Sequence, residues 1–244
     1  YLIADEAGFA AADEEEGKAL LETGMKCAEK WFDLNEGTPA MCAVLAGMSI
    51  ATVKTDVAFS GRCLSAARRM ESAYLAAHPE DATGIFLMST ALYRADGSLF
   101  DKGRAESFLA AAPEPDLTDE NIFYGCAFYL FTRRRVDTLV CERLMKQMTE
   151  ESSSIAQNDR RSPYMAGEDR NDDRGIFASA IKISFVNYAI TNHEYRTALQ
   201  NYVHYFLGRN SEKKVQIPEN SSMGWYLLLM ACTQEETAAI SEDG

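Results

Sequence analysis

The chain has 244 residues, of which 47% are hydrophobic and 25% are charged, proportions typical of a folded globular protein. No apolar run reaches the roughly 20 residues that a membrane-spanning helix needs, so we expect no membrane partner. The formal net charge is −13, from 37 acidic and 24 basic residues. Because nucleic acids and anionic membranes are bound through clustered basic surfaces, this balance argues against both.

The basic residues form only one short cluster, Arg133–Arg135, between two predicted helices, and we interpret it as a solvated helix junction. The chain also contains six cysteines: Cys27, Cys42, Cys63, Cys126, Cys141 and Cys232. None belongs to a Cys-x-x-Cys pair, and none has a histidine at zinc-site spacing. We therefore expect free thiols that fill small spaces in the core, and they do not indicate a cellular compartment.

Apolar residues recur with the 3.6-residue period of α-helices almost throughout, whereas the alternation typical of strands is nearly absent. Helices are expected at 14–33, 39–53, 56–78, 82–96, 98–111, 118–132, 134–155, 174–192, 194–208 and 221–234. Thr38 before Pro39 is a typical helix start, as is Thr118 before an acidic first turn. Gly97 and Gly208 are typical helix stops.

The predicted connections are short, which favours antiparallel helix hairpins. The small residues of Ala40–Ala46 would let helices approach closely. The fold class is therefore all-α, with antiparallel hairpins forming an (α/α)6-type toroid that is incomplete, at about ten helices. A helical-repeat solenoid is the alternative, although no fixed repeat period is present. We expect one domain at 1–234, an acidic disordered tail at 235–244, and long loops at 152–173 and 210–222, where function usually lies on a helical scaffold.

Two segments near the C-terminus resemble a known family. Gly175–Tyr195 and the following Tyr202–Asn210, which ends in Leu-Gly-Arg-Asn, are similar to consecutive helices of glycoside hydrolase family 9, the inverting endoglucanases. Thr38–Ala46 and Ser89–Gly97 resemble two upstream helices of that family in the same order. The resemblance covers roughly residues 38–234, the C-terminal part of the family's fold. It implies an (α/α)6 toroid, a polysaccharide or oligosaccharide as partner, and secretion.

The sequence also departs from the family at functional motifs. Ser211 stands directly after Asn210 where the family has a proline, no His-His-Arg motif follows, and nothing before Thr38 matches well the Asp-Ala-Gly-Asp motif that supplies the catalytic base. No base aspartate can be identified. Tyr1 opens the chain without the basic region or the cleavage site of a signal peptide, and we expect that the original start has been removed. The missing N-terminal part of the same protein is then an expected partner.

For site residues, the resemblance implies that Glu219 is the general acid, six positions before Trp225 rather than the family's five. The alternative is that Glu219 only complements the dipole of the following helix. Candidates for stacking on sugar rings are Trp225, Tyr226 and Tyr164, with Tyr124 and Trp31 as further aromatic residues that could instead belong to the core. His78, His193 and His204 are too scattered for a metal site.

One loop carries a weak calcium pattern. Asp169, Asn171 and Asp173 have the alternating spacing with which calcium loops begin. Arg174 stands where an EF-hand needs glycine and Ala180 where it needs glutamate, so an EF-hand is excluded. The alternatives are a looser calcium site and a polar loop whose last aspartates cap the next helix. For the protein as a whole, the two hypotheses are an inverting β-glucan hydrolase and a catalytically degenerate or fragmentary relative that serves as a carbohydrate-binding or protein-interaction module.

Overall fold

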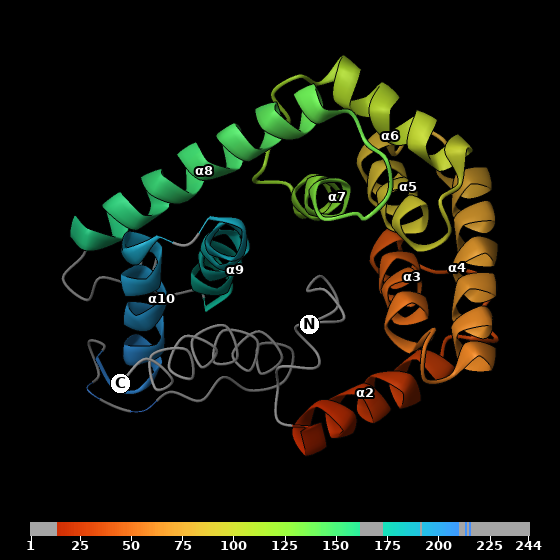
Figure 1. Cartoon of the computed structure of the whole chain (residues 1–244), viewed down its shortest axis with the longest axis horizontal. Coiled ribbons are helices and arrows are strands. Elements are labelled where there is room, and N and C mark those ends of the chain that lie inside the picture. The colour runs from red at the N-terminus through yellow and green to blue at the C-terminus, as the bar shows by residue number, and fades with distance from the viewer. Residues whose placement is uncertain (1–13, 162–172, 191, 210–212, 214, 216–244) are drawn as a thin grey trace. The chain divides into compact units, whose positions relative to one another are not determined.

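The computed structural model describes residues 14–161, 173–190, 192–209, 213 and 215, and every regular element among them is an α-helix (Figure 1). The helices are α2 (Glu14–Glu29), α3 (Pro39–Thr52), α4 (Val57–Ala77), α5 (Ala82–Asp96), α6 (Leu99–Ala111), α7 (Glu120–Leu130), α8 (Thr138–Arg161), α9 (Asp173–Ala189) and α10 (His193–Phe206). The first nine predicted helices are thus confirmed. The tenth, at 221–234, lies outside the described residues. No helix in the described part of the chain is long and apolar enough to cross a bilayer.

Side-chain capping explains where several helices begin and end. The Thr38 hydroxyl accepts a hydrogen bond from the Met41 amide, which confirms the predicted start of α3. The prediction for Thr118 is wrong, because Asp119 caps α7 by accepting from the Ile122 amide. Gly97 ends α5 at a φ of 80°, and Gly208 follows α10 at a φ of 110°, so both predicted glycine stops are confirmed.

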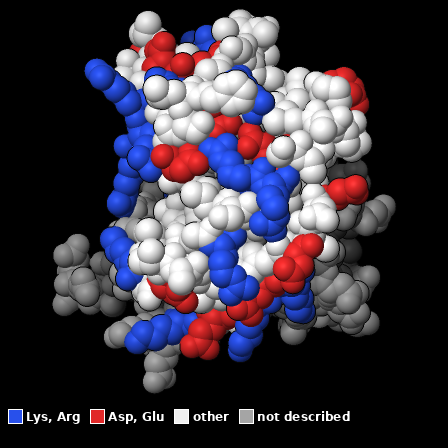
Figure 2. Space-filling model, turned by 90° about the vertical axis from the view of Figure 1, so that its right-hand side faces the viewer, with Lys and Arg blue, Asp and Glu red and all other residues white. Residues whose placement is uncertain are grey.

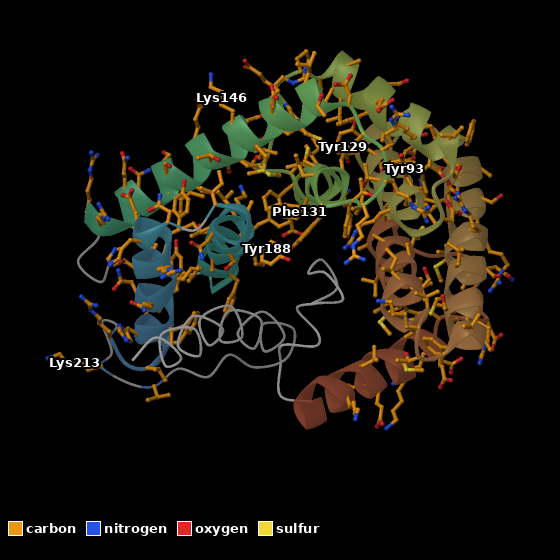
Figure 3. All side chains as sticks on the ribbon, viewed as in Figure 1. Tyr93, Tyr129, Phe131, Lys146, Tyr188 and Lys213 are labelled. Atoms are coloured by element: carbon orange, nitrogen blue, oxygen red, sulfur yellow. The ribbon has the colours of Figure 1, made fainter. Side chains whose placement is uncertain are left out.

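The largest error in helix limits concerns α8, predicted at 134–155. The helix begins later because Asp137 accepts hydrogen bonds from the amides of residues 139 and 140. The connection before it is fixed by two tyrosines, labelled in Figure 3: Tyr93 donates to the Arg135 carbonyl, and the Tyr129 hydroxyl accepts from the Asp137 amide. The helix also continues to Arg161, so the predicted loop from 152 is wrong over its first ten residues. Within this last part of the helix, Ser152 and Asp159 are buried.

The chain divides into two compact units, Tyr1–Leu144 and Met145–Gly244. In the first, α3 pairs with α4 and α5 pairs with α6, as successive hairpins. The first members of the hairpins also pack on one another, since α3 contacts α5 and α5 contacts α7. This arrangement places α3, α5 and α7 in an inner layer, with α4 and α6 outside it (Figure 1). Alternation between an inner and an outer helix is the packing on which (α/α) toroids are built.

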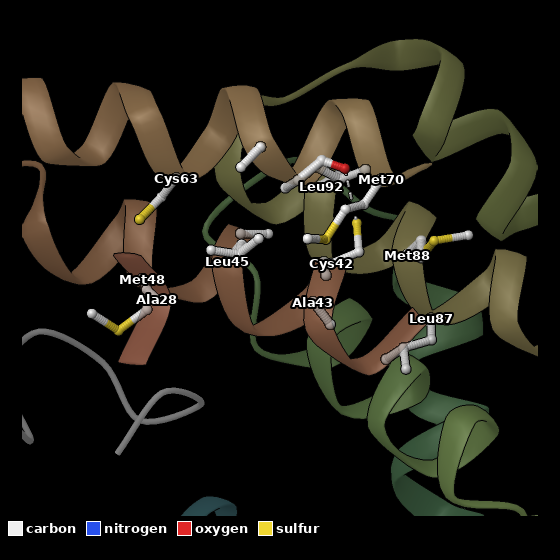
Figure 4. Close-up of a cluster of buried hydrophobic side chains, with 14 of the residues drawn as sticks. Ala28, Cys42, Ala43, Leu45, Met48, Cys63, Met70, Leu87, Met88 and Leu92 are labelled. Carbon is white, nitrogen blue, oxygen red and sulfur yellow. Dashed lines mark hydrogen bonds between the residues drawn. The ribbon is translucent and has the colours of Figure 1, made fainter. Parts of the chain in front are cut away.

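Alanine and cysteine side chains lie among leucine and methionine side chains in the hydrophobic core of the first unit (Figure 4). Cys42, Leu45 and Ala46 of α3 are fully buried, and the Cys42 thiol donates to the Ala67 carbonyl of α4 across 3.3 Å. A Cβ atom at Gly125 of α7 would lie 2.5 Å from the Phe86 ring of α5, so only glycine permits this approach. The prediction of free core thiols is confirmed for Cys42, Cys63 and Cys126, whereas Cys27 is exposed, Cys141 is half-buried, and Cys232 is not described.

The second unit is built from α9, α10 and the part of α8 from Met145 onward. The Phe177 and Phe206 rings stack with their centroids 4.9 Å apart, and both side chains are buried. Tyr202 and Val203 are buried as well, whereas Leu207 is 50% exposed. Helix α10 ends at Phe206, so Leu207 no longer lies on the helix face that packs inward.

Candidate functional site

Four residues that the sequence indicates for catalysis and sugar binding lie outside the described residues: Glu219, Trp225, Tyr226 and Tyr164. The same holds for Asp169 and Asn171 of the weak calcium pattern, while Asp173 is the first residue of α9. Among the residues that the structure describes, no group of three or more His, Cys, Asp or Glu side chains could hold a metal ion. The described structure therefore bears on these predictions only through the scaffold that leads to them.

The scaffold on the approach to Glu219 is the end of α10, within the family-like segment Tyr202–Asn210. The Tyr202 hydroxyl donates to the Asp159 carboxyl of α8 and also bonds with the Ser179 side chain of α9. Tyr202 is fully buried, and this burial together with the Asp159 charge raises its pKa well above the usual value. One phenol thus joins three helices and fixes α10.

Beyond this phenol, the last turn of α10 is held by a second polar contact. Arg209 Nη1 donates to the Asn201 side-chain oxygen across 3.1 Å, and Asn201 is itself buried. The guanidinium therefore bridges back over the turn at Gly208 onto the helix. Arg209 precedes Glu219 by ten residues in the sequence. Sequence reasoning missed the role of Asp159, because residues 152–161 were expected to form a loop.

Paired carboxyl groups, the usual mark of acid–base chemistry, do occur in the first unit. Glu71 of α4 and Asp101 of α6 are both buried, at 6% and 0% exposure. Arg68 Nη1 lies 2.8 Å from Glu71 Oε2 and 2.6 Å from Asp101 Oδ2, and Arg104 Nη1 lies 2.9 Å from Glu71 Oε1. Arg68 also reaches Asp96 at 2.6 Å. We call these five residues the ionic network; it joins α4, α5 and α6.

The ionic network stabilises the fold rather than reacting with a sugar. Its three carboxyls face only two guanidiniums, and both buried carboxyls are ion-paired with arginines. Burial and the charge of Asp101 raise the pKa of Glu71 despite the two arginines. Figure 2 shows the face on which α4 lies, where basic side chains alternate with acidic ones. A buried acid that is already ion-paired has no route to a substrate oxygen.

Two aromatic residues considered for sugar stacking also have a structural role. Trp31 and Tyr124 are partly buried and pack against the hydrophobic core of the first unit. Burial raises the pKa of Tyr124 above its usual value. Trp31 and Tyr124 therefore fit the role of core residues better than that of residues that stack on sugar rings.

The first unit also carries an open groove of about 670 Å³, between the chain that follows α2 and the first half of α4. Its lining is mainly polar and includes Asp33 and Asn35 on one side, with Arg62, Ser65 and Arg69 on the other. The last three recur at the spacing of one helix face, a signal that was visible in the sequence but was not used. The volume falls within the range of small-molecule sites, roughly 300–1,000 Å³.

Comparison with solved structures identifies the fold. The chain is similar to the crystal structure of GH family 9 endoglucanase J30, with 14% identity, a TM-score of 0.64, and coverage of 72% of this chain and 37% of that one. A metagenome-derived glycoside hydrolase family 9 endoglucanase matches over the same shares with 18% identity and a TM-score of 0.62. A GH9 protein of Bacteroides ovatus matches with 18% identity and a TM-score of 0.55, over 70% of this chain and 38% of that one.

These matches show a likeness of fold, and comparisons of sequence do not extend it. No protein-family model and no curated protein sequence matches the chain. The chain spans little more than a third of the length of the solved endoglucanases. The predicted fold class is confirmed by the helices, by the alternation of inner and outer helices in the first unit, and by these structures. The chain has the all-helical toroid fold of glycoside hydrolase family 9 endoglucanases, over a part of that fold.

Proposed function

We propose that this chain is the scaffold and general-acid part of a glycoside hydrolase that cleaves β-glucan with inversion. The observation that carries the proposal is the match of 72% of the chain to family 9 endoglucanases. The family-like segment Tyr202–Asn210 supports it, because its first part is buried and its last turn is held by the contact between Arg209 and Asn201. A rigid support of this kind is what a catalytic group on the following segment requires.

In the proposed reaction, Glu219 protonates the glycosidic oxygen while a second carboxylate activates water on the other side of the sugar ring. The two carboxyl groups of inverting enzymes stand roughly 6.5–9.5 Å apart, which leaves room for that water. The ionic network of the first unit does not supply the second group, because its carboxyls are buried and ion-paired. We therefore assign the base to an N-terminal part of the same protein.

Substrate binding in this proposal relies on Trp225, Tyr226 and Tyr164, whose rings would stack on the apolar faces of glucose units. A calcium ion at Asp169, Asn171 and Asp173 would fix the loop before α9. If the calcium proposal holds, adding calcium to the chelator-treated protein raises its melting temperature, and Asn171→Ala reduces that rise. An unchanged melting temperature would remove calcium from the proposal.

The second candidate is a module that binds polysaccharide without cleaving it. It is favoured by the absence of an aspartate motif for the base in this sequence. The two functions differ in the production of reducing ends: a hydrolase releases them from glucan, whereas a module binds glucan and releases none. Binding therefore has to be measured beside hydrolysis.

The experiment is a reducing-sugar assay on carboxymethyl cellulose and barley β-glucan, with affinity electrophoresis on the same substrates. It compares the chain alone, the protein including its N-terminal part, Glu219→Gln, and the control Glu212→Gln. We expect hydrolysis only when the N-terminal part is present, a loss of at least about 100-fold with Glu219→Gln, and activity within twofold with the control. Glucan binding without hydrolysis in every form would establish the module, and neither activity would refute both functions.

A further inference from the structure

We infer that the groove between the chain after α2 and the first half of α4 binds a carboxylate-bearing saccharide, such as one built from uronic acids. This groove is defined by Phe32, Asp33, Asn35, Ala58, Gly61, Arg62, Ser65 and Arg69. The ligand differs from the neutral β-glucan of the proposed reaction. That the anion is carried by a saccharide rests on the proposed function.

Both arginines of the groove are positioned by one buried residue. The Arg62 guanidinium lies 4.4 Å above the centroid of the Phe32 ring, and Arg69 Nη2 donates to the Phe32 carbonyl oxygen. Phe32 is itself held in the core, 7% exposed and 5.3 Å from the Phe59 ring. A guanidinium held by a rigid neighbour loses less side-chain entropy when it binds a ligand.

The two guanidiniums keep most of their hydrogen-bonding capacity. Each guanidinium has five N–H donors in a planar fork that matches a carboxylate. Of the donors on the two side chains, one N–H of Arg69 is used in the hydrogen bond to the Phe32 carbonyl oxygen. Among the described residues, neither Arg62 nor Arg69 forms an ion pair, in contrast to Arg68 and Arg104 of the ionic network. Both side chains are exposed, on the same face of α4.

The charge of the groove selects a single carboxylate over a phosphate. Two arginines and Asp33 line it, which leaves a net charge of +1. One uronate carboxylate neutralises that charge, and any further carboxylate of an oligouronide lies on another sugar unit, whereas a phosphate concentrates about two negative charges on one group beside Asp33. Asp33, Asn35 and Ser65 add acceptors and donors for hydroxyl groups, as a sugar ring requires.

A neutral glucan lacks the group that this groove recognises. Neutral sugars bind mainly by stacking on aromatic faces. The aromatic ring of the groove, Phe32, is buried and its face is occupied by Arg62. Recognition must then come from the arginines and from the polar side chains around them.

The test is calorimetric titration with trigalacturonate, using its methyl ester as the neutral match and inorganic phosphate as a second anion. We expect the ester to bind at least about 10-fold more weakly, since a bidentate guanidinium–carboxylate contact is lost. Arg62→Gln and Arg69→Gln should each weaken trigalacturonate binding by a similar factor. The matched control is Arg94→Gln, an arginine that also lies over a ring, 5.9 Å from the Phe128 centroid, but outside the groove; it should bind within twofold of the unaltered chain.

Ser65→Glu tests the groove without removing either arginine, and we expect this variant to fold normally. Position 65 is exposed between Arg62 and Arg69 on α4, so a glutamate there pairs with them and blocks the groove. We expect binding to be lost while the melting temperature is kept. Equal affinity for trigalacturonate and its ester, unchanged binding in the three groove variants, or tighter binding of phosphate would each overturn the inference.

The same preparations separate this inference from the proposed function. Hydrolysis of neutral β-glucan without binding of trigalacturonate would refute the groove alone. Binding of trigalacturonate without any action on β-glucan would refute the hydrolase alone.

Discussion

The helices within each of the two compact units are held by different kinds of contact. In the first, Tyr1–Leu144, helices approach closely because alanine, glycine and cysteine line the inner layer, and charged residues are collected in the ionic network. In the second, Met145–Gly244, two tyrosine hydroxyls of α10 bond with the same neighbouring helix, α8: Tyr202 with Asp159, and Tyr195 with Ser153 and the Thr149 carbonyl. The first unit has a comparable contact, from Tyr129 of α7 to Glu106 of α6, beside its small-residue packing. Small-residue packing is sensitive to added volume, whereas a hydroxyl network is sensitive to the loss of single atoms. The same fold is thus stabilised in two ways.

The largest expected effect is in the second unit, at its stacked phenylalanine pair. Phe206→Ala should cost about 3–5 kcal/mol of unfolding free energy, because a fully buried ring leaves a cavity. Urea unfolding measures the loss, and hydrogen exchange locates it. We expect α9 and α10 to lose protection first, with α3–α5 unchanged. Equal loss of protection in both units would break the distinction between them.

The second effect tests the hydroxyl network. Tyr202→Phe removes only an oxygen, and should cost about 1.5–3 kcal/mol because a hydrogen bond to a buried carboxyl is lost. Tyr188→Phe is the control, since that ring is 55% exposed and its substitution should change the unfolding free energy by less than about 0.5 kcal/mol. A small effect at position 202 would show that ring packing alone holds α10.

The third effect tests close packing in the first unit. Gly125→Ala should cost about 1–3 kcal/mol, because the added methyl group would lie 2.5 Å from the Phe86 ring. Gly103→Ala in α6 is the matched control, since nothing lies within 4 Å of its Cβ position and alanine is the better helix former. That variant should gain about 0.5–1 kcal/mol in thermal or urea unfolding. Equal effects of the two alanines would refute the role of Gly125 in the contact.

The smallest effect is the pH dependence of the ionic network. Burial and the Asp101 charge raise the pKa of Glu71 in the folded state, although Arg68 and Arg104 face it. The stability that Glu71 contributes is therefore largest at low pH, and it falls as the pH rises from the unfolded pKa through the folded one. Glu71→Gln should destabilise less at pH 8 than at pH 5 in urea unfolding.

A control for this pH dependence is available on α8. Glu150→Gln removes the carboxylate of an exposed pair with Lys146, whose side chains are 67% and 77% exposed. Its effect should be small and nearly the same at both pH values. A Glu71→Gln cost that grows with pH would contradict the raised pKa.

By itself the sequence determined the helices and their class. The 3.6-residue apolar period and the glycine stops placed α5 and α6 to within a residue, because these signals depend on neighbours in the chain. The Leu-Gly-Arg-Asn segment and the Ala-rich helix pointed to the correct fold. The sequence contains two adjacent residues that could each cap α7, Thr118 and Asp119. The cap is Asp119, because the backbone conformation at the turn places its side chain at the first turn of the helix.

Only the tertiary structure decided which polar residues are buried and what they contact. The loop predicted from residue 152 is helical as far as Arg161, because Ser152 and Asp159 have partners on other helices. The groove depends likewise on Phe32 lying beside α4, 37 positions before Arg69. Contacts between residues far apart in the chain depend on the packing of whole helices, and no local pattern specifies them.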